Sequence, residues 1–308
     1  MTLSTKNRRN AVVGAAGTIA MAAGLLAAAP AVAAPASDNA NSNAQCAGRS
    51  VPASKISFQM YSYAGWTGWG GENTEQVLAE LAEVGYRNIE PFGGTFDGLS
   101  AGEVTDLLDE YGLKAPTSHG STDEASWDTT LDYAKEVGQR YMGSGGFASP
   151  GIGTYEDVLA TAATLDRLGE RSVKNGTGKI FGHNHGSEFT TTYTDPETGD
   201  VKSAWEIIVE NTDPRYVTFQ LDTYWAADAG VDVAALIEEH GDRIELLHIK
   251  DGDLNGTQTD VGEGVMEWGP ILEAAQGHVK YYVIEQDGAE PSIDFAEESF
   301  DFLTCFSF

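Results

Sequence analysis

Several histidines and carboxylates in the sequence share one kind of position, because each stands where a short apolar run ends. They are, in chain order, Glu90, His119, His183, His185, Asp222, His248 and Glu285. Four of the chain's six histidines belong to this set, whereas chance placement would scatter them among helices and loops. Carboxylates and imidazoles bind divalent metal ions and move protons. The set therefore predicts a site for metal-dependent or acid–base chemistry.

Three of these residues, Asp222, His248 and Glu285, end three successive apolar runs. On neighbouring strands they would converge, and the strand before them would supply a fourth metal ligand. His183 and His185 are two residues apart and share a strand face. We prefer His183 because it lies deeper in the strand, with His185 as the alternative. Such a mixed nitrogen and oxygen set favours Mn²⁺, with Co²⁺, Fe²⁺ or Zn²⁺ as alternatives. The structural alternative is a hydrogen-bonded polar cluster without a metal.

Other polar residues at these ends have less specific patterns. Lys250 is two residues after His248 and could neutralise an oxyanion or accept a proton; alternatively it is a surface lysine paired with Asp251. Glu90 could bind a substrate hydroxyl or act as a base; alternatively it pairs with Arg87.

Further substrate-binding candidates lie in the segments that follow the apolar runs. They are Glu188, Trp66 and Trp225. Aromatic faces at the mouth of a binding site pack well against the C–H surfaces of sugars. Ordinary packing beneath loops is the alternative for each tryptophan.

The elements that must position these residues alternate between two patterns. Strands are predicted over residues 56–61, 86–90, 113–119, 140–143, 178–185, 217–222, 244–248 and 280–285. Helical spacing covers residues 74–84, 100–111, 127–137, 155–174, 203–209, 233–240, 268–275 and 295–303.

Eight strands alternating with eight helices over about 250 residues predict an α/β fold, the (β/α)8 TIM barrel, as a single domain over residues 55–308. The carboxyl ends of all strands then meet at one mouth, where the polar residues would converge. An open doubly wound sheet is the alternative. It would normally carry a glycine-rich phosphate loop after the first strand, and residues 61–65 (Y-S-Y-A-G) do not form one.

The charge of the chain limits its partners. Among 308 residues, 47 are Asp or Glu and 18 are Lys or Arg, which gives a formal charge of -29. Nucleic acids and anionic membranes repel such a protein, so we expect neither as a partner. A neutral or cationic small molecule fits better, although the charge could serve solubility alone.

The first residues have the pattern of a bacterial export signal. Lys6, Arg8 and Arg9 precede an alanine-rich apolar run, and a small-residue exit follows near residues 31–33 (A-V-A). We therefore expect an export signal over residues 1–34, by the general or the twin-arginine route, and a flexible leader over residues 35–54. A membrane-anchoring helix is the alternative. The mature protein would be secreted or held at the cell envelope, with no membrane segment left after cleavage.

The chain has two cysteines, Cys46 and Cys305, near opposite ends of the expected mature protein. An exported protein meets an oxidising compartment, and a closed barrel brings its first and last elements together. We expect a disulfide between them, with two free thiols as the alternative.

The motifs that carry these residues are familiar in combination. They are G-H-N-H-G-S-E-F at 182–189, L-D-T-Y-W at 221–225, L-H-I-K-D at 247–251, V-G-E-G at 261–264 before Trp268, and I-E-Q-D at 284–287. Their order and sequence resemble the xylose-isomerase-like barrel superfamily, over residues 55–303. Its members are usually named sugar phosphate isomerase/epimerases, and it also includes inosose dehydratase and ketose 3-epimerases.

The resemblance implies a divalent metal held by His183 or His185, Asp222, His248 and Glu285. That metal would chelate a carbonyl and a neighbouring hydroxyl of a sugar, and a carboxylate would move the proton of the acidified C–H. Ketose epimerases have Glu on strand five, where this chain has His, so Glu285 is the remaining base of the usual pair.

A histidine-rich fifth strand resembles the inosose dehydratase branch, which eliminates water beside a ketone. His119, His185 or Lys250 would then protonate the leaving group. The superfamily also contains a DNA-repair endonuclease, which the acidic charge argues against.

The sequence thus predicts a metal-dependent isomerase or epimerase that acts on an unphosphorylated sugar or keto-sugar through an enediolate. The substrate is expected without phosphate because we find no basic cluster and because the net charge repels anions. The alternatives are a metal-dependent lyase that eliminates a β-leaving group from a keto-sugar, inosose or keto-glycoside, and a non-catalytic extracellular sugar-binding protein. A homodimer is compatible with the sequence but is not decided by it.

Overall fold

The computed structural model describes residues 48–68, 71 and 73–308. The predicted export signal and most of the predicted leader, including Cys46, lie outside these residues. In the part of the chain that is described, no helix is both long and apolar enough to cross a membrane.

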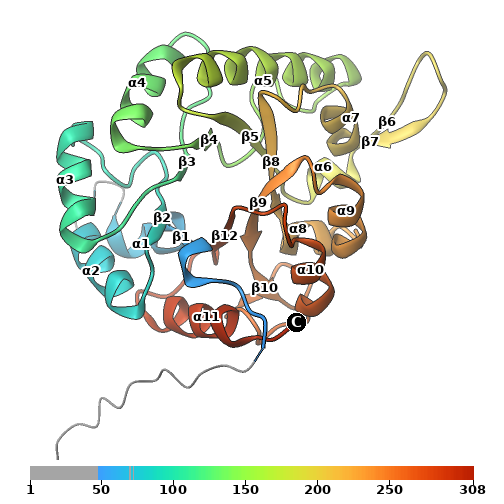
Figure 1. The fold of residues 1–308 in the computed structure, drawn as a ribbon. Coiled ribbons are helices and arrows are strands. Elements are labelled where there is room, and N and C mark those ends of the chain that lie inside the picture. Colours follow the sequence, from blue (N-terminus) through green and yellow to red (C-terminus); the bar gives the residue numbers. More distant parts are fainter. Residues whose placement is uncertain (1–47, 69–70, 72) are drawn as a thin grey trace, which may run out of the picture. The chain divides into compact units, whose positions relative to one another are not determined.

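Eight parallel strands form a nearly closed barrel, as predicted (Figure 1). They are β1 (Ile56–Gln59), β2 (Asn88–Glu90), β3 (Thr117–His119), β4 (Tyr141–Gly143), β5 (Lys179–His183), β8 (Val217–Asp222), β9 (Ile244–Ile249) and β12 (Tyr281–Ile284). Their order around the sheet is β2-β1-β12-β9-β8-β5-β4-β3. Three backbone hydrogen bonds join the seam between β2 and β3. They run from Ile89 N–H to Lys114 O, from Lys114 N–H to Arg87 O and from His119 N–H to Pro91 O.

Helices cover the outside of this barrel (Figure 1). The longer ones in the described residues are α2 (Thr74–Val84), α3 (Ala101–Tyr111), α4 (Trp127–Val137), α5 (Tyr155–Asn175), α7 (Ala204–Glu210), α9 (Val233–His240), α10 (Trp268–Ala274) and α11 (Asp294–Cys305). Each turns its apolar residues inward; α2, for example, buries Val77, Leu78 and Leu81. A capping box begins α3, because the side chains of Ser100 and Glu103 each accept a hydrogen bond from the other's backbone N–H group.

Two strands end two residues earlier than the sequence predicts. The first stops at Gln59, whose side-chain oxygen accepts a hydrogen bond from Tyr61 N–H at 3.1 Å and starts a 3₁₀ helix, η2 (Met60–Tyr63). The fifth stops at His183, so His185 lies beyond the strand. In both places the chain bends at the mouth of the barrel, and the side chains of Tyr61 and His185 lie there.

Several short elements lack a signal in the sequence. They are η1 (Ala53–Lys55), α1 (Ala64–Thr67), α6 (Ser187–Thr190), α8 (Thr223–Asp228) and the hairpins β6 (Thr192–Thr194) with β7 (Val201–Ser203) and β10 (Asp251–Gly252) with β11 (Gln258–Thr259). Apart from η1, all lie in segments that follow the carboxyl end of a barrel strand.

The start of the described chain packs on its last helix. Val51, within the predicted leader, is 2% exposed, and its N–H donates to Leu303 O at 3.2 Å. Cys305, at the end of α11, is disulfide-bonded. Its expected partner Cys46 lies outside the described residues.

The longest helix, α5, approaches the barrel through a glycine. A Cβ built on Gly169 would lie 2.5 Å from the backbone oxygen of Tyr216 and 2.9 Å from the side chain of Ile180. Because the closest atom belongs to the backbone, it cannot rotate away. The absence of a side chain at Gly169 therefore allows α5 to lie directly against the start of β8.

We predict that Gly169→Ala destabilises the protein by about 1–3 kcal/mol, because the added methyl group forces α5 away from the barrel. The control is Gly102→Ala in α3, where a Cβ would meet Glu136 Oε1 at 3.5 Å, an ordinary contact distance. That change should be neutral or stabilise by up to about 1 kcal/mol, since alanine is the better helix former. Chemical denaturation measures both, and equal free energies of unfolding would contradict this account of the packing.

Candidate functional site

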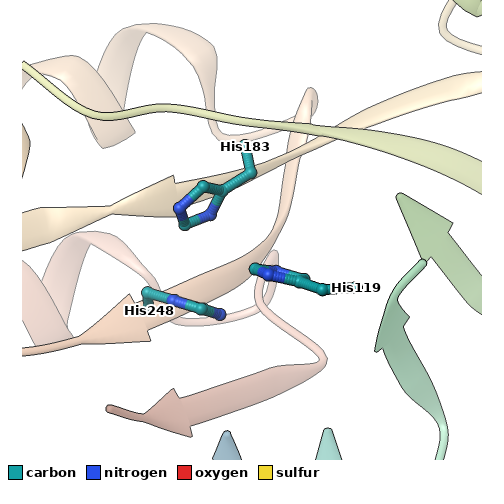
Figure 2. A group of neighbouring side chains, drawn as sticks. All are labelled: His119, His183 and His248. Atoms are coloured by element: carbon teal, nitrogen blue, oxygen red, sulfur yellow. The ribbon is translucent and has the colours of Figure 1, made fainter. Parts of the chain in front are cut away.

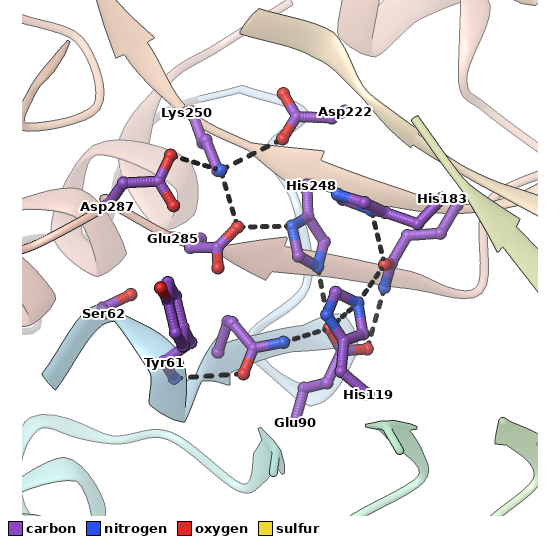
Figure 3. Close-up of polar contacts among 12 residues, drawn as sticks. Tyr61, Ser62, Glu90, His119, His183, Asp222, His248, Lys250, Glu285 and Asp287 are labelled. Carbon is purple, nitrogen blue, oxygen red and sulfur yellow. Dashed lines mark hydrogen bonds and ion pairs between the residues drawn. The ribbon is translucent and has the colours of Figure 1, made fainter. Parts of the chain in front are cut away.

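The carboxyl ends of the strands open into a pocket of about 290 Å³. It is lined by Tyr61, Phe92, His119, Gly145, His183, His185, Lys250, Glu285 and Asp287. Figure 3 shows how the polar side chains among these residues connect to others beneath them. Three of the lining residues come from the ends of different barrel strands, namely His119 from β3, His183 from β5 and Glu285 directly after β12.

Glu90 lies beneath the pocket and is fully buried. Its Oε1 accepts a hydrogen bond from Gln59 at 2.7 Å and lies 2.7 Å from His248 Nε2, and its Oε2 accepts from Gln220 at 2.8 Å. Burial works against its charge, but the neighbouring His119 and His248 outweigh burial and lower the pKa of Glu90. Glu90 is therefore a buried carboxylate that holds other site residues in place.

Gln220 joins Glu90 to two histidines (Figure 3). Its amide nitrogen donates to Glu90, while its oxygen accepts from His119 Nε2 at 2.7 Å and from His183 Nδ1 at 3.0 Å. Since His183 donates through Nδ1, its Nε2 keeps a lone pair. Burial, reinforced by the nearby histidines, holds the pKa of His183 well below the ordinary value, so His183 is a neutral base or ligand.

His248 lies between two carboxylates. Its Nδ1 is 2.7 Å from Glu285 Oε2, and its Nε2 is 2.7 Å from Glu90 Oε1. Burial opposes the positive charge, but Glu285 and Glu90 together raise the pKa of His248 to about 10. Without a metal, this imidazole therefore carries both protons at neutral pH and links the floor of the site to its wall.

Lys250 is 1% exposed and contacts three carboxylates. Its Nζ lies 2.8 Å from Glu285 Oε2, 2.9 Å from Asp287 Oδ2 and 3.2 Å from Asp222 Oδ2. Burial opposes the charge of Lys250, yet these carboxylates raise its pKa. Burial likewise opposes the charge of Glu285, but the charges of Lys250 and His248 outweigh it and hold the pKa of Glu285 well below the ordinary value. Lys250 is thus part of the site and is not the surface lysine of the alternative interpretation.

Asp222 is held rigidly at the end of β8. Its Oδ1 accepts a hydrogen bond from Trp225 N–H at 3.0 Å and caps α8, and its backbone N–H and C=O are both bonded to the Asn184 side chain. Its other oxygen, Oδ2, is buried without a hydrogen-bond partner and lies 3.2 Å from the Lys250 ammonium. Burial exceeds the effect of Lys250 and raises the pKa of Asp222.

The residues fit a divalent metal, although they form two groups. Asp222, His248 and Glu285 each offer a ligand atom within 4.8 Å of the others, and the buried Asp222 Oδ2 lacks a hydrogen bond. His183 belongs to a second group, with His119 and His248, which is drawn in Figure 2. His248 is common to both groups. Two carboxylates and an imidazole are ligands that suit Mn²⁺, Fe²⁺, Co²⁺ or Zn²⁺.

The predicted site residues fall into two classes. Glu285, Lys250, His119, His183 and His185 line the pocket. The four residues predicted to bind substrate, Glu90, Glu188, Trp66 and Trp225, are not among its lining residues. Glu90 lies below it, Glu188 is buried and accepts the His185 backbone N–H, Trp66 packs against Tyr63, and Trp225 has its ring centre 6.0 Å from Lys250 Nζ.

Sequence reasoning missed the neutral polar residues that connect the charged ones. Gln59, Gln220 and Asn184 are each buried and bonded within the site. Gln220 had a detectable signal, because it stands two residues before Asp222 and on the same face of β8. Asp287 stands in the I-E-Q-D motif but was given no role, and the pocket residue Tyr61 carried no clear pattern.

Asp251 anchors the loop that follows β9. Its carboxylate accepts hydrogen bonds from the backbone N–H groups of Gly262 and Met266 and, at 2.7 Å, from Trp268 Nε1. Within this loop, Gln258 reaches the rim of the pocket and bonds to Asp287 through both its amide nitrogen and its oxygen. The Asp of the L-H-I-K-D motif is therefore a loop anchor and leaves Lys250 to the pocket.

Comparison with known proteins agrees with this architecture. The family model for the xylose isomerase-like TIM barrel matches residues 78–304. An inosose dehydratase from Geobacillus thermodenitrificans is 26% identical over 149 residues, which cover 42% of this chain and 46% of that protein. The match thus spans about half the length of this curated relative.

Solved structures resemble the whole barrel. A sugar phosphate isomerase/epimerase from Parabacteroides distasonis is 24% identical, with a TM-score of 0.68 over 84% of this chain and 96% of that one. A D-allulose 3-epimerase from Methylomonas sp. is 16% identical, with a TM-score of 0.60 over 80% and 96%. At these identities the likeness shows the fold alone.

We predict that Glu90→Gln lowers the pKa of His248 by about one unit or more, because it removes one of the two carboxylates that stabilise the imidazolium. NMR titration of the histidine ring in the metal-free protein measures this value. Glu245→Gln is the matched control. Glu245 lies in β9, the strand that carries His248, but it pairs with Lys179, away from the pocket. A His248 pKa that is the same in Glu90→Gln and in the unmodified protein would contradict the role given to Glu90.

Proposed function

The chain belongs to the xylose isomerase-like TIM barrel family, and on that basis we propose that it is a metal-dependent isomerase or epimerase of unphosphorylated sugars or keto-sugars. One observation supports this most strongly. Asp222, His248 and Glu285 converge from adjacent barrel strands beside a pocket, and a buried Asp222 oxygen has no hydrogen bond there.

A divalent ion bound by Asp222, His248 and Glu285 would supply Lewis acidity, which polarises a substrate carbonyl and acidifies the neighbouring C–H. Glu285 lines the pocket with its pKa held low, so it is ionised and able to accept a proton. Lys250 presents positive charge beside it, where an enolate oxygen would form. Neutral His183 offers a second proton acceptor on another wall of the pocket.

An unphosphorylated substrate is favoured by the charges of the pocket. Among its lining residues Lys250 is the only Lys or Arg, and three carboxylates already surround it. A phosphate group would have to compete with those carboxylates for a single ammonium. A neutral polyol or ketone avoids that repulsion, and the net charge of -29 acts in the same direction.

A lyase that acts on a keto-sugar, an inosose or a keto-glycoside is the second candidate. The curated relative in the comparison is an inosose dehydratase, and three histidines, His119, His183 and His185, line the pocket. Elimination needs a proton donor for the leaving group in addition to the base, and His185 or Lys250 would supply it. Either ionised Glu285 or neutral His183 would accept the C–H proton.

Proton NMR in D₂O distinguishes the candidates, with the Mn²⁺-treated protein and a panel of ketoses, keto-sugars and inososes. After the Mn²⁺ is removed with a chelator, solvent deuterium beside the carbonyl of a product with an unchanged skeleton supports the isomerase or epimerase. An enone or a released leaving group supports the lyase. Binding of a sugar without turnover would contradict both and indicate a sugar-binding protein.

The predicted export over residues 1–34 would place this chemistry outside the cytoplasm, and we propose that location together with the function. It agrees with the expected lack of phosphorylated substrates. Homodimer formation stays a prediction.

We predict that Asp222→Asn lowers Mn²⁺ uptake from one ion per chain to a small fraction of that value, because the change removes the negative charge of one of the three proposed ligands. Metal analysis after gel filtration measures the stoichiometry. Asp228→Asn, six residues further along α8, is the control and should retain the metal. Equal metal content in both variants would remove Asp222 from the ligand set.

A further inference from the structure

The Lys250 ammonium occupies the oxygens that a metal ion would need. It lies 3.2 Å from Asp222 Oδ2 and 2.8 Å from Glu285 Oε2. Both residues belong to the group that fits a metal, and Figure 3 shows the ammonium between them. The side chain is 1% exposed, so bulk water screens its charge only weakly.

A divalent ion and this ammonium would repel each other strongly if both bound the same two oxygens at these distances. The ammonium must therefore leave Asp222 and Glu285 when a metal enters. Its third partner remains available, because Asp287 Oδ2 lies 2.9 Å from Nζ and Asp287 is not in the metal-binding group.

We propose that Lys250 is a resident cation of the site, which holds Asp222 and Glu285 in the metal-free protein and moves onto Asp287 alone when a divalent metal binds. The inference rests on the proposed function, since it concerns the same metal. It assigns Asp287 as a positioning residue that receives the displaced ammonium.

Asp287 is placed for this task. Its side chain is 38% exposed, so it lies at the rim, and the lysine side chain can pivot toward it without crossing the barrel. Gln258 fixes its position, because the Gln258 amide donates to Asp287 Oδ2 at 2.7 Å and its oxygen accepts the Asp287 backbone N–H at 2.8 Å. The rim carboxylate therefore stays in place whether or not the metal is bound.

The exchange also keeps the charge of the site in balance. In the metal-free protein the ammonium offsets the buried carboxylates, and an uncompensated charge there would be costly. After the exchange the metal would take over that role at Asp222 and Glu285. Lys250 would then face the pocket, which it already lines, and bind a substrate oxygen beside Glu285.

A double-mutant cycle on the full-length mature protein tests the proposal. Mn²⁺ binding is measured by the electron paramagnetic resonance signal of the free ion, in the unmodified protein, in Lys250→Met, in Asp287→Asn and in the double variant. Lys179→Met is the matched control, because Lys179 also pairs with a glutamate, Glu245, but at the opposite end of the barrel strands. Methionine keeps the length of the lysine stem and removes its charge.

We expect Lys250→Met to tighten Mn²⁺ binding by about tenfold or more, because no cation has to be displaced. Asp287→Asn should weaken it by about tenfold, because the ammonium then has nowhere else to bind. In the Lys250→Met background the same Asp287→Asn change should have little effect, and that non-additivity is the signature of the exchange. If Lys250→Met does not fold, the Mn²⁺ affinity of Asp287→Asn relative to the unmodified protein decides whether the inference holds.

Equal Mn²⁺ affinities in the unmodified protein and in both single variants would overturn this inference and leave the proposed function standing. Binding to Lys250→Met but not to the unmodified protein would support the competition and contradict a metal requirement in the natural chain. No Mn²⁺ binding by any of the proteins would overturn both.

Discussion

Carboxylates that are buried under the mouth of this barrel need compensation, since an isolated buried charge costs several kcal/mol. Glu90 receives it from two glutamines and His248, and Glu285 receives it from His248 and Lys250. Because these partners come from strands that are distant in the sequence, the charges can be balanced only when the barrel is assembled. The polar centre therefore depends on the fold, and it fixes the positions of the reactive groups in return.

The sequence predicted the barrel well because strands and helices alternate with clear periodicity. Helices α4 and α9 begin and end at the residues that the helical spacing indicated. The polar residues at the ends of the parallel strands meet at one mouth. The shortened first strand was not predictable in the same way. Gln59 continues the alternating pattern, and only its side-chain bond to Tyr61 N–H shows that the chain turns there.

Most of the charged and imidazole residues around the pocket were among the sequence candidates, with Asp287 as an exception, whereas the neutral residues that connect them were missed. Asp222, His248 and Glu285 are recognisable because such residues seldom end an apolar run without a reason. Gln220 and Asn184 carry no charge, and their importance comes from partners on other strands. Periodicity also could not decide between His183 and His185. The structure places His183 in β5, bonded to Gln220, and His185 after the strand.

The hydrogen bonds of Asp251 separate the base of the loop after β9 from its exposed tip. One buried carboxylate holds the base of the loop through Gly262, Met266 and Trp268, while residues 253–257 at its tip are exposed. Insertions or substitutions at that tip would alter the chain next to Gln258, which bonds to Asp287 at the pocket rim, and would leave the hydrogen bonds of Asp251 in place. Loop and barrel can therefore diverge at different rates, and selectivity can shift while the reacting groups keep their geometry.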